Sequence, residues 1–113
     1  MVHRALAAAD ALAEEGISVE VVDPRSLYPL DVDTLATSAR KTGRAVIVDE
    51  GVLRYGATAE LAATVYENAF DHLDSPVVRV GGAETPMPFS SPLEAAAIPS
   101  EESIIAAVRR VML

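Results

Sequence analysis

The sequence contains no cysteine and no tryptophan, and aromatic residues make up only 4% of its 113 residues. Without cysteine, the chain can form no disulfide, no catalytic thiolate and no zinc–thiolate site. With so few aromatic rings, its core has to be built from alanine, valine, leucine and isoleucine. Half of the residues are apolar and the mean hydropathy is +0.26, so we expect one globular domain over residues 1–113.

Basic residues are also scarce. The sequence has nine Lys and Arg residues and 17 Asp and Glu residues, so its formal net charge is −8. Nucleic acid and anionic lipid both require a basic binding surface, so the composition disfavours nucleic-acid and membrane partners. The charge favours solubility and, more weakly, a basic partner protein. The sequence has no apolar run near the roughly 20 residues of a membrane span and no signal-peptide pattern. We therefore expect a cytoplasmic location.

Helical and strand patterns alternate along the chain. Helices are predicted over 1–15, 31–41, 57–72 and from Ser100 to the end, and strands over 17–22, 44–49 and 77–80. The alternation is typical of an α/β fold, here a three-layer α/β/α arrangement around a mostly parallel sheet. Residues 81–99 carry several prolines and are predicted to have little regular structure. A loop of that length is usually functional or packed against a partner.

The chain opens directly on a helix. Parallel α/β layers usually begin on a strand, and three short strands make a thin sheet for three or four helices. From the sequence we therefore expect that a first strand, N-terminal to residue 1, is missing from the sheet.

No self-contained active site is predicted. None of the serines lies in a G-x-S-x-G turn, and the two histidines, His3 and His72, are interpreted as surface or helix-end residues. Asp49 and Glu50 are adjacent acids at the end of a buried strand, where parallel sheets bind ligands, although a solvated strand end is the simpler explanation of both residues. The glycines fit no phosphate-binding motif. We predict no catalytic, cofactor-binding or metal-binding residues on this chain.

Several stretches together resemble one family. They cover residues 1–6, 16–31, 41–51, 74–80, 86–94 and 98–100, including Tyr28-Pro29-Leu30-Asp31 and Pro86-Met87-Pro88-Phe89. In this order they look like the transketolase C-terminal-like domain. More narrowly, they resemble its version in the beta subunit of pyruvate, branched-chain 2-oxo acid and acetoin dehydrogenase complexes.

The resemblance implies a role in a larger enzyme. Such a beta subunit pairs with an alpha subunit as an α2β2 heterotetramer, with thiamine diphosphate and magnesium at the interface between the alpha subunit and the beta subunit's N-terminal domain. The enzyme decarboxylates a 2-oxo acid and acylates the lipoyl group of the dihydrolipoyl acyltransferase core. This domain is then expected to contact the alpha subunit, the second beta subunit and the acyltransferase, and to be inactive alone.

The resemblance also assigns expected interface residues. Asp74 and the carboxylate of Leu113 are candidates for binding a basic residue of the acyltransferase. Glu50, Gly51 and Gly56 are candidates for a loop at a subunit interface. Family members have a strand before the first helix, near the middle of the sheet. Its loss would expose two unpaired strand edges, which we expect to be filled by reordering, a tag segment or an intermolecular strand.

Two other interpretations stay open. A stand-alone flavodoxin-like interaction or ligand-binding module fits the size and the acids at the strand end, but it would rarely begin on a helix. The equivalent domain of transketolase or deoxyxylulose phosphate synthase is closer to the main prediction. The segment from Pro86 to Glu94 argues against that second alternative.

Overall fold

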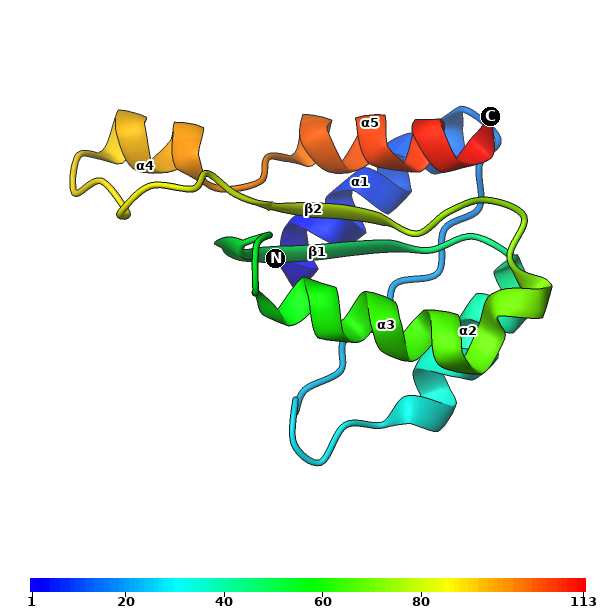
Figure 1. Cartoon of the computed structure of the whole chain (residues 1–113). Coiled ribbons are helices and arrows are strands. Elements are labelled where there is room, and N and C mark those ends of the chain that lie inside the picture. Colours follow the sequence, from blue (N-terminus) through cyan, green and yellow to red (C-terminus); the bar gives the residue numbers. More distant parts are fainter.

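The chain folds into three layers around a small parallel sheet (Figure 1). The computed structural model describes residues 1–113. Strand β1 (Val46–Val52) pairs in parallel with β2 (Val78–Gly82), in a register that sets Val46 opposite Val78. Helices α1 (Val2–Glu14) and α5 (Glu101–Met112) cover one face, and α2 (Val32–Thr42) and α3 (Ala57–Ala69) cover the other. The predicted α/β class with a parallel sheet is confirmed.

All four predicted helices are present, and capping residues mark both ends of α2 and the start of α5. Asp31 caps α2 by accepting a hydrogen bond from the Thr34 N–H at 3.0 Å, and Gly43 ends it in the left-handed region. Ser100 caps α5 in the same way, accepting from Ser103 at 3.1 Å. The helix predicted over 57–72 is α3 followed by a 3₁₀ turn, η1 (Phe70–His72).

The prediction of a strand over residues 17–22 is wrong. The segment is extended, but none of residues 18–22 takes part in a backbone hydrogen bond, so it belongs to no sheet. Its alternating side chains produced the strand prediction. A strand also needs a neighbouring backbone, and the sheet therefore has two strands where three were predicted.

The prediction that residues 81–99 lack regular structure is also wrong in part. Residues Ser91–Ala97 form a short helix, α4, with Pro92 in its first turn. Proline fits there because the first N–H groups of a helix have no intrahelical partner. The prolines of this segment thus delimit a helix as well as interrupting the chain.

Small residues dominate the core, as the low aromatic content predicts. Ala39, Val65 and Ala69 pack together where α2 meets α3, and α5 buries Ile104 and Val108 against the sheet. Such short side chains allow the helices to approach closely. None of these helices has the length and apolar character needed to cross a lipid bilayer.

The Asp31 cap predicts a pH dependence of stability. Hydrogen bonds from the Thr34 hydroxyl and N–H lower the pKa of Asp31 below its ordinary 3.8. A lowered pKa in the folded state contributes stability that is full above the unfolded-state value and is lost as pH falls through the folded-state value. We expect Asp31→Asn to flatten the fall of the melting temperature below about pH 4. Thermal melts of the two chains between pH 7 and about pH 2.5 measure this fall. An equal fall of the melting temperature in both chains would contradict the prediction.

Candidate interface site

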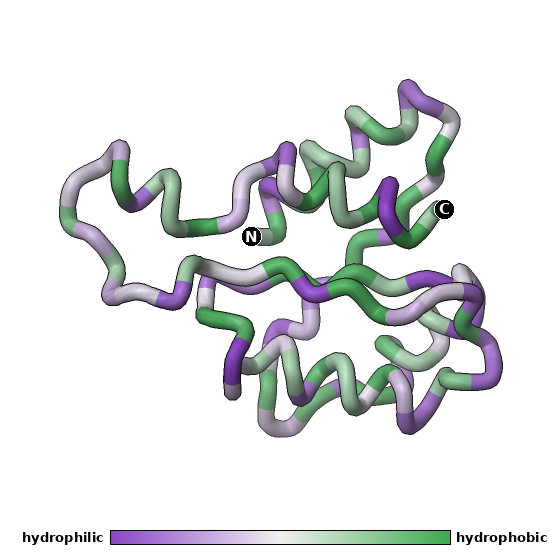
Figure 2. Tube along the Cα trace, turned by 45° about the horizontal axis from the view of Figure 1, so that its top comes forward, coloured by the Kyte–Doolittle hydropathy of each residue, from purple (hydrophilic) through white to green (hydrophobic).

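Three exposed apolar side chains lie on an arm at the carboxyl end of the sheet. Residues 84–97, here called the arm, run out from β2 and return through α4, and the arm projects beyond the three layers (Figure 1). Its exposed apolar side chains are Met87, Phe89 and Leu93, and Phe89 is fully exposed at 103% of its reference area. Figure 2 shows apolar stretches along this projecting segment. Exposed apolar side chains contribute no burial free energy to a monomer, and a group of them typically marks a binding surface.

The base of the arm is anchored to the body of the domain. The Ala83 N–H donates to the Ala97 carbonyl oxygen at 2.8 Å, and this hydrogen bond joins the two ends of the arm. Beside it, an Arg54 guanidinium nitrogen lies 3.6 Å from a Glu84 carboxylate oxygen. The ion pair connects the arm to the loop between β1 and α3, so the two segments lie side by side.

That loop carries a second fully exposed ring. Tyr55 is 98% exposed and has a positive φ of 56°, a conformation that non-glycine residues rarely adopt. Arg79 of β2 binds this loop, because its guanidinium donates to the Leu53 carbonyl oxygen at 2.8 Å. This hydrogen bond holds Leu53, two residues before Tyr55, and the Tyr55 ring is exposed to solvent at the carboxyl edge of the sheet.

Glu50 and Gly51 belong to β1 and not to the loop in which they were predicted. The strand continues to Val52, with an irregular register between Val48 and Val52. Gly56 does lie at the loop's end, where it precedes the first turn of α3. A methyl group on Gly56 would overlap the Val52 carbonyl oxygen, so glycine is required there for close packing.

Asp74 lies at the opposite end of the sheet. Its N–H donates to the Gly43 carbonyl oxygen at 2.7 Å, and its carboxylate is 3.7 Å from an Arg44 nitrogen. Arg44 also donates through Nε to the Val111 carbonyl oxygen at 2.9 Å, in the last turn of α5. The exposed Asp74 is therefore held close to the end of α5, beside which Leu113 is fully exposed.

The predicted interface residues thus form two separate patches. Glu50 and Gly51 lie near the carboxyl end of β1 and Gly56 lies in the loop that follows it, whereas Asp74 precedes the amino end of β2. Because the strands are parallel, these patches lie at opposite edges of the sheet. The sequence analysis named residues 81–99 as a segment of the kind that packs against a partner, but it did not single out Tyr55 or the exposed apolar side chains of the arm.

The chain's own polar groups do not fit a magnesium diphosphate site. No three histidine, aspartate or glutamate side chains converge in a geometry that could hold a metal ion. His3 and His72 are both exposed, on α1 and on η1.

Comparison with known proteins identifies the family. Residues 1–104 match the family model described as transketolase, C-terminal domain. The chain belongs to this family. It is 50% identical over 110 residues to pyruvate dehydrogenase E1 component subunit beta-1 of Arabidopsis thaliana, and 46% identical to the E1 beta subunit of Rickettsia bellii. It is also 47% identical over 112 residues to the beta subunit of the acetoin:2,6-dichlorophenolindophenol oxidoreductase of Cupriavidus necator.

These matches cover almost all of this domain but only part of each relative. They include 97–99% of the chain and 30–34% of the three relatives, so the chain spans about a third of their length. A solved structure described as a split gene transketolase, inactive beta4 tetramer, superposes with a TM-score of 0.76 at 33% identity. That match covers 98% of this chain and 35% of the other. The transketolase-like fold predicted from the sequence is confirmed.

Proposed function

We propose that this domain is an assembly module of the beta subunit of a thiamine-diphosphate-dependent 2-oxo acid dehydrogenase. The observation that carries the proposal is the fully exposed pair of rings, Tyr55 and Phe89, on two segments joined at the carboxyl edge of the sheet. Aromatic side chains with this exposure are typical of the centres of protein–protein interfaces. The relatives named as pyruvate dehydrogenase E1 beta subunits support the type of enzyme in which we place this interface.

In this proposal the parent enzyme carries out the chemistry and the domain supplies contacts. The assembled enzyme decarboxylates a 2-oxo acid and passes the acyl group to a lipoyl group of the dihydrolipoyl acyltransferase. The alpha subunit, together with the rest of the beta subunit, holds thiamine diphosphate and magnesium. The arm and the Tyr55 loop contact the alpha subunit, and the domain alone has no turnover.

We propose a different partner for the opposite edge of the sheet. Asp74 is exposed, and its internal partner Arg44 approaches only to 3.7 Å, so its carboxylate can accept a further charge-assisted hydrogen bond. A basic residue of the acyltransferase's small subunit-binding domain would supply the donor. The exposed terminal residue Leu113 lies in the same region and extends this patch.

Reversing the charge of Asp74 tests this second contact. We expect Asp74→Lys to weaken binding of the acyltransferase's subunit-binding domain by about tenfold or more, because an attraction becomes a repulsion. Isothermal titration at low and high salt measures the effect, which should shrink as salt screens the charges. Asp71→Lys is the matched control, since Asp71 is an exposed acid in the nearby η1 turn. Equal affinity of both variants and the unchanged chain would remove Asp74 from the interface.

One observation supports an alternative function, in which the chain is the equivalent domain of a transketolase. The solved structure that superposes on this chain is described as a split gene transketolase. Identity with that chain is 33%, whereas identity with the named dehydrogenase beta subunits is 46–50%. The higher identity supports the dehydrogenase, and turnover of a 2-oxo acid by the assembled complex distinguishes it from ketol transfer between sugars.

A further inference from the structure

The loop between β1 and α3 is a tight turn that places Tyr55 at a strained position. The Gly56 N–H donates to the Leu53 carbonyl oxygen at 3.3 Å, which closes a turn from Leu53 to Gly56. Tyr55 is the third residue of this turn, and its φ is 56°. Glycine or asparagine normally takes this place when φ is positive, because the Cβ atom of other residues crowds the backbone there. The tyrosine therefore costs the folded chain stability.

The domain itself offers no contact that offsets this strain. Tyr55 is 98% exposed, so its ring buries almost no apolar area. The turn does contain a glycine, but that residue is Gly56, where φ is −90°. A methyl group on Gly56 would overlap the Val52 carbonyl oxygen, so this glycine serves close packing and not the positive φ. A strained residue without internal contacts points to a contact outside the domain.

Arg79 of β2 binds the backbone on one side of this turn and α3 on the other. Its guanidinium nitrogen Nη1 lies 2.8 Å from the Leu53 carbonyl oxygen and 3.4 Å from the Thr58 hydroxyl oxygen. Leu53 begins the turn, and Thr58 is a buried residue in the first turn of α3. The positive charge of the donor makes such hydrogen bonds stronger than those between neutral groups. The half-buried Arg79 thus restrains both sides of the turn.

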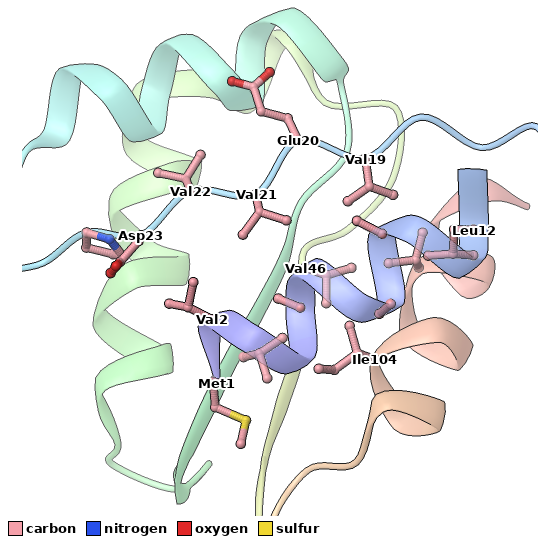
Figure 3. A pocket seen from close by; sticks show the side chains of 16 residues that line it. Met1, Val2, Leu12, Val19, Glu20, Val21, Val22, Asp23, Val46 and Ile104 are labelled. Atoms are coloured by element: carbon pink, nitrogen blue, oxygen red, sulfur yellow. The ribbon is translucent and has the colours of Figure 1, made fainter. Parts of the chain in front are cut away.

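Strand β2 is also the only strand that pairs with β1. On its other side, β1 faces an apolar groove lined by Val46, Val48 and the valines of residues 19–22 (Figure 3). No strand pairs with β1 across this groove, since the sheet consists of β1 and β2. The position of the loop after β1 therefore depends on contacts with β2, and Arg79 provides the side-chain hydrogen bond from β2 to this loop.

We propose that Arg79 is a positioning residue, which holds the turn in its strained form and so presents the Tyr55 ring for insertion into a pocket of the alpha subunit. This inference rests on the assembly role proposed above. The Tyr55 turn is continuous with the arm through the ion pair between Arg54 and Glu84, so the same partner meets both segments. A ring that is fixed before binding loses little conformational freedom on binding. A buried tyrosine needs apolar walls and one hydrogen-bond partner for its hydroxyl group, and these requirements define the chemistry of the pocket.

Replacing Tyr55 with glycine separates binding from stability. Relief of the positive φ outweighs the added freedom of glycine in the unfolded chain, so we expect Tyr55→Gly to raise the melting temperature by about 1–4 °C. The same change removes the ring, so the dissociation constant for the purified alpha subunit should rise about tenfold or more. A melting temperature below that of the unchanged chain would overturn the proposal.

Arg25→Gly is the matched control for the backbone effect. Arg25 is the other exposed residue with a positive φ, of 63°. This variant should also melt at a higher temperature, but its affinity for the alpha subunit should stay unchanged. An equal loss of affinity in Arg25→Gly and Tyr55→Gly would show that the Tyr55 ring is not the binding group.

Arg79→Met tests whether Arg79 acts through the Tyr55 ring. Methionine keeps most of the length of the side chain but has no N–H to donate. We expect the dissociation constant to rise about tenfold, and the heteronuclear NOE of the Arg54 and Tyr55 amides to fall in the isolated chain. In a double-mutant cycle, Arg79→Met should add nothing to the loss of affinity caused by Tyr55→Ala. Equal losses with and without the ring would show that Arg79 acts by another route.

Arg79→Lys provides a second variant in case Arg79→Met destabilises the fold. Lysine retains a charged donor without the planar guanidinium, so we expect its affinity and NOE values to lie between those of the other two chains. The melting temperatures and NOE values require no partner. If the unchanged chain does not bind the alpha subunit, the assembly role is wrong and this inference falls with it. If the chain binds and folded Arg79→Met binds equally tightly, only the role of Arg79 is wrong.

Discussion

A Gly82→Ala chain is expected to lose about 3 kcal/mol of its free energy of unfolding. Gly82 ends β2 against the irregular part of β1, and it is buried. A methyl group there would overlap the Glu50 carbonyl oxygen and would also lie 3.3 Å from the Ala97 carbonyl oxygen. Both obstacles are backbone atoms, so relief requires moving β1 or the base of the arm. Guanidinium denaturation of the two chains measures the loss.

Gly51→Ala is the matched control within the same pair of strands. A methyl group on Gly51 would meet the end of the Asp49 side chain, with its Oδ2 at 2.8 Å, and no backbone atom nearby. That carboxylate can rotate away, so we expect a loss below about 1 kcal/mol. Similar losses at both positions would show that the close approach of Gly82 to β1 does not determine the packing here.

A Phe89→Ala chain is expected to bind the alpha subunit about thirtyfold more weakly, which corresponds to about 2 kcal/mol for a central aromatic contact. Phe89 is fully exposed in the free domain, so its removal should leave the melting temperature almost unchanged. The effect would therefore be on association alone. Titration of the fluorescently labelled chain with a purified alpha subunit gives the dissociation constant.

Phe70→Ala controls for the loss of any exposed phenyl ring. Phe70 is 68% exposed, and it lies in η1, at the other end of α3 from the Tyr55 loop. Its ring also packs on Tyr66 with the centroids 6.2 Å apart, so it already has an intramolecular contact. Affinity for the alpha subunit should stay within about twofold. If Phe70→Ala weakens binding as much as Phe89→Ala, the arm is not the contact surface.

Local chemistry allowed most of the helices to be predicted from the sequence. Asp31 and Ser100 cap their helices through bonds to residues three positions later, so a short window of sequence contains the whole interaction. Gly16 and Gly43 both have positive φ just past the ends of helices, as glycine at such positions predicts. Such features need no knowledge of the tertiary structure.

Features that depend on distant parts of the chain could not be predicted in this way. Residues 17–22 have a strand's alternation, but strand formation depends on a neighbour that the pattern does not contain. Glu50 and Gly51 extend β1 because Gly81 and Gly82 let β2 approach them closely. Exposure of Tyr55 and Phe89 is likewise a result of the folded surface, since aromatic residues are usually buried.

Affinity capture tests the proposed assembly role most directly. The tagged chain serves as bait in extract from its native cells, the Phe89→Ala chain serves as a parallel bait, and mass spectrometry identifies the retained proteins. We predict recovery of an alpha-type thiamine-diphosphate-binding subunit or of a lipoyl acyltransferase, and we expect the Phe89→Ala bait to retain less of the alpha subunit. Recovery of neither by a folded bait would contradict the assembly role.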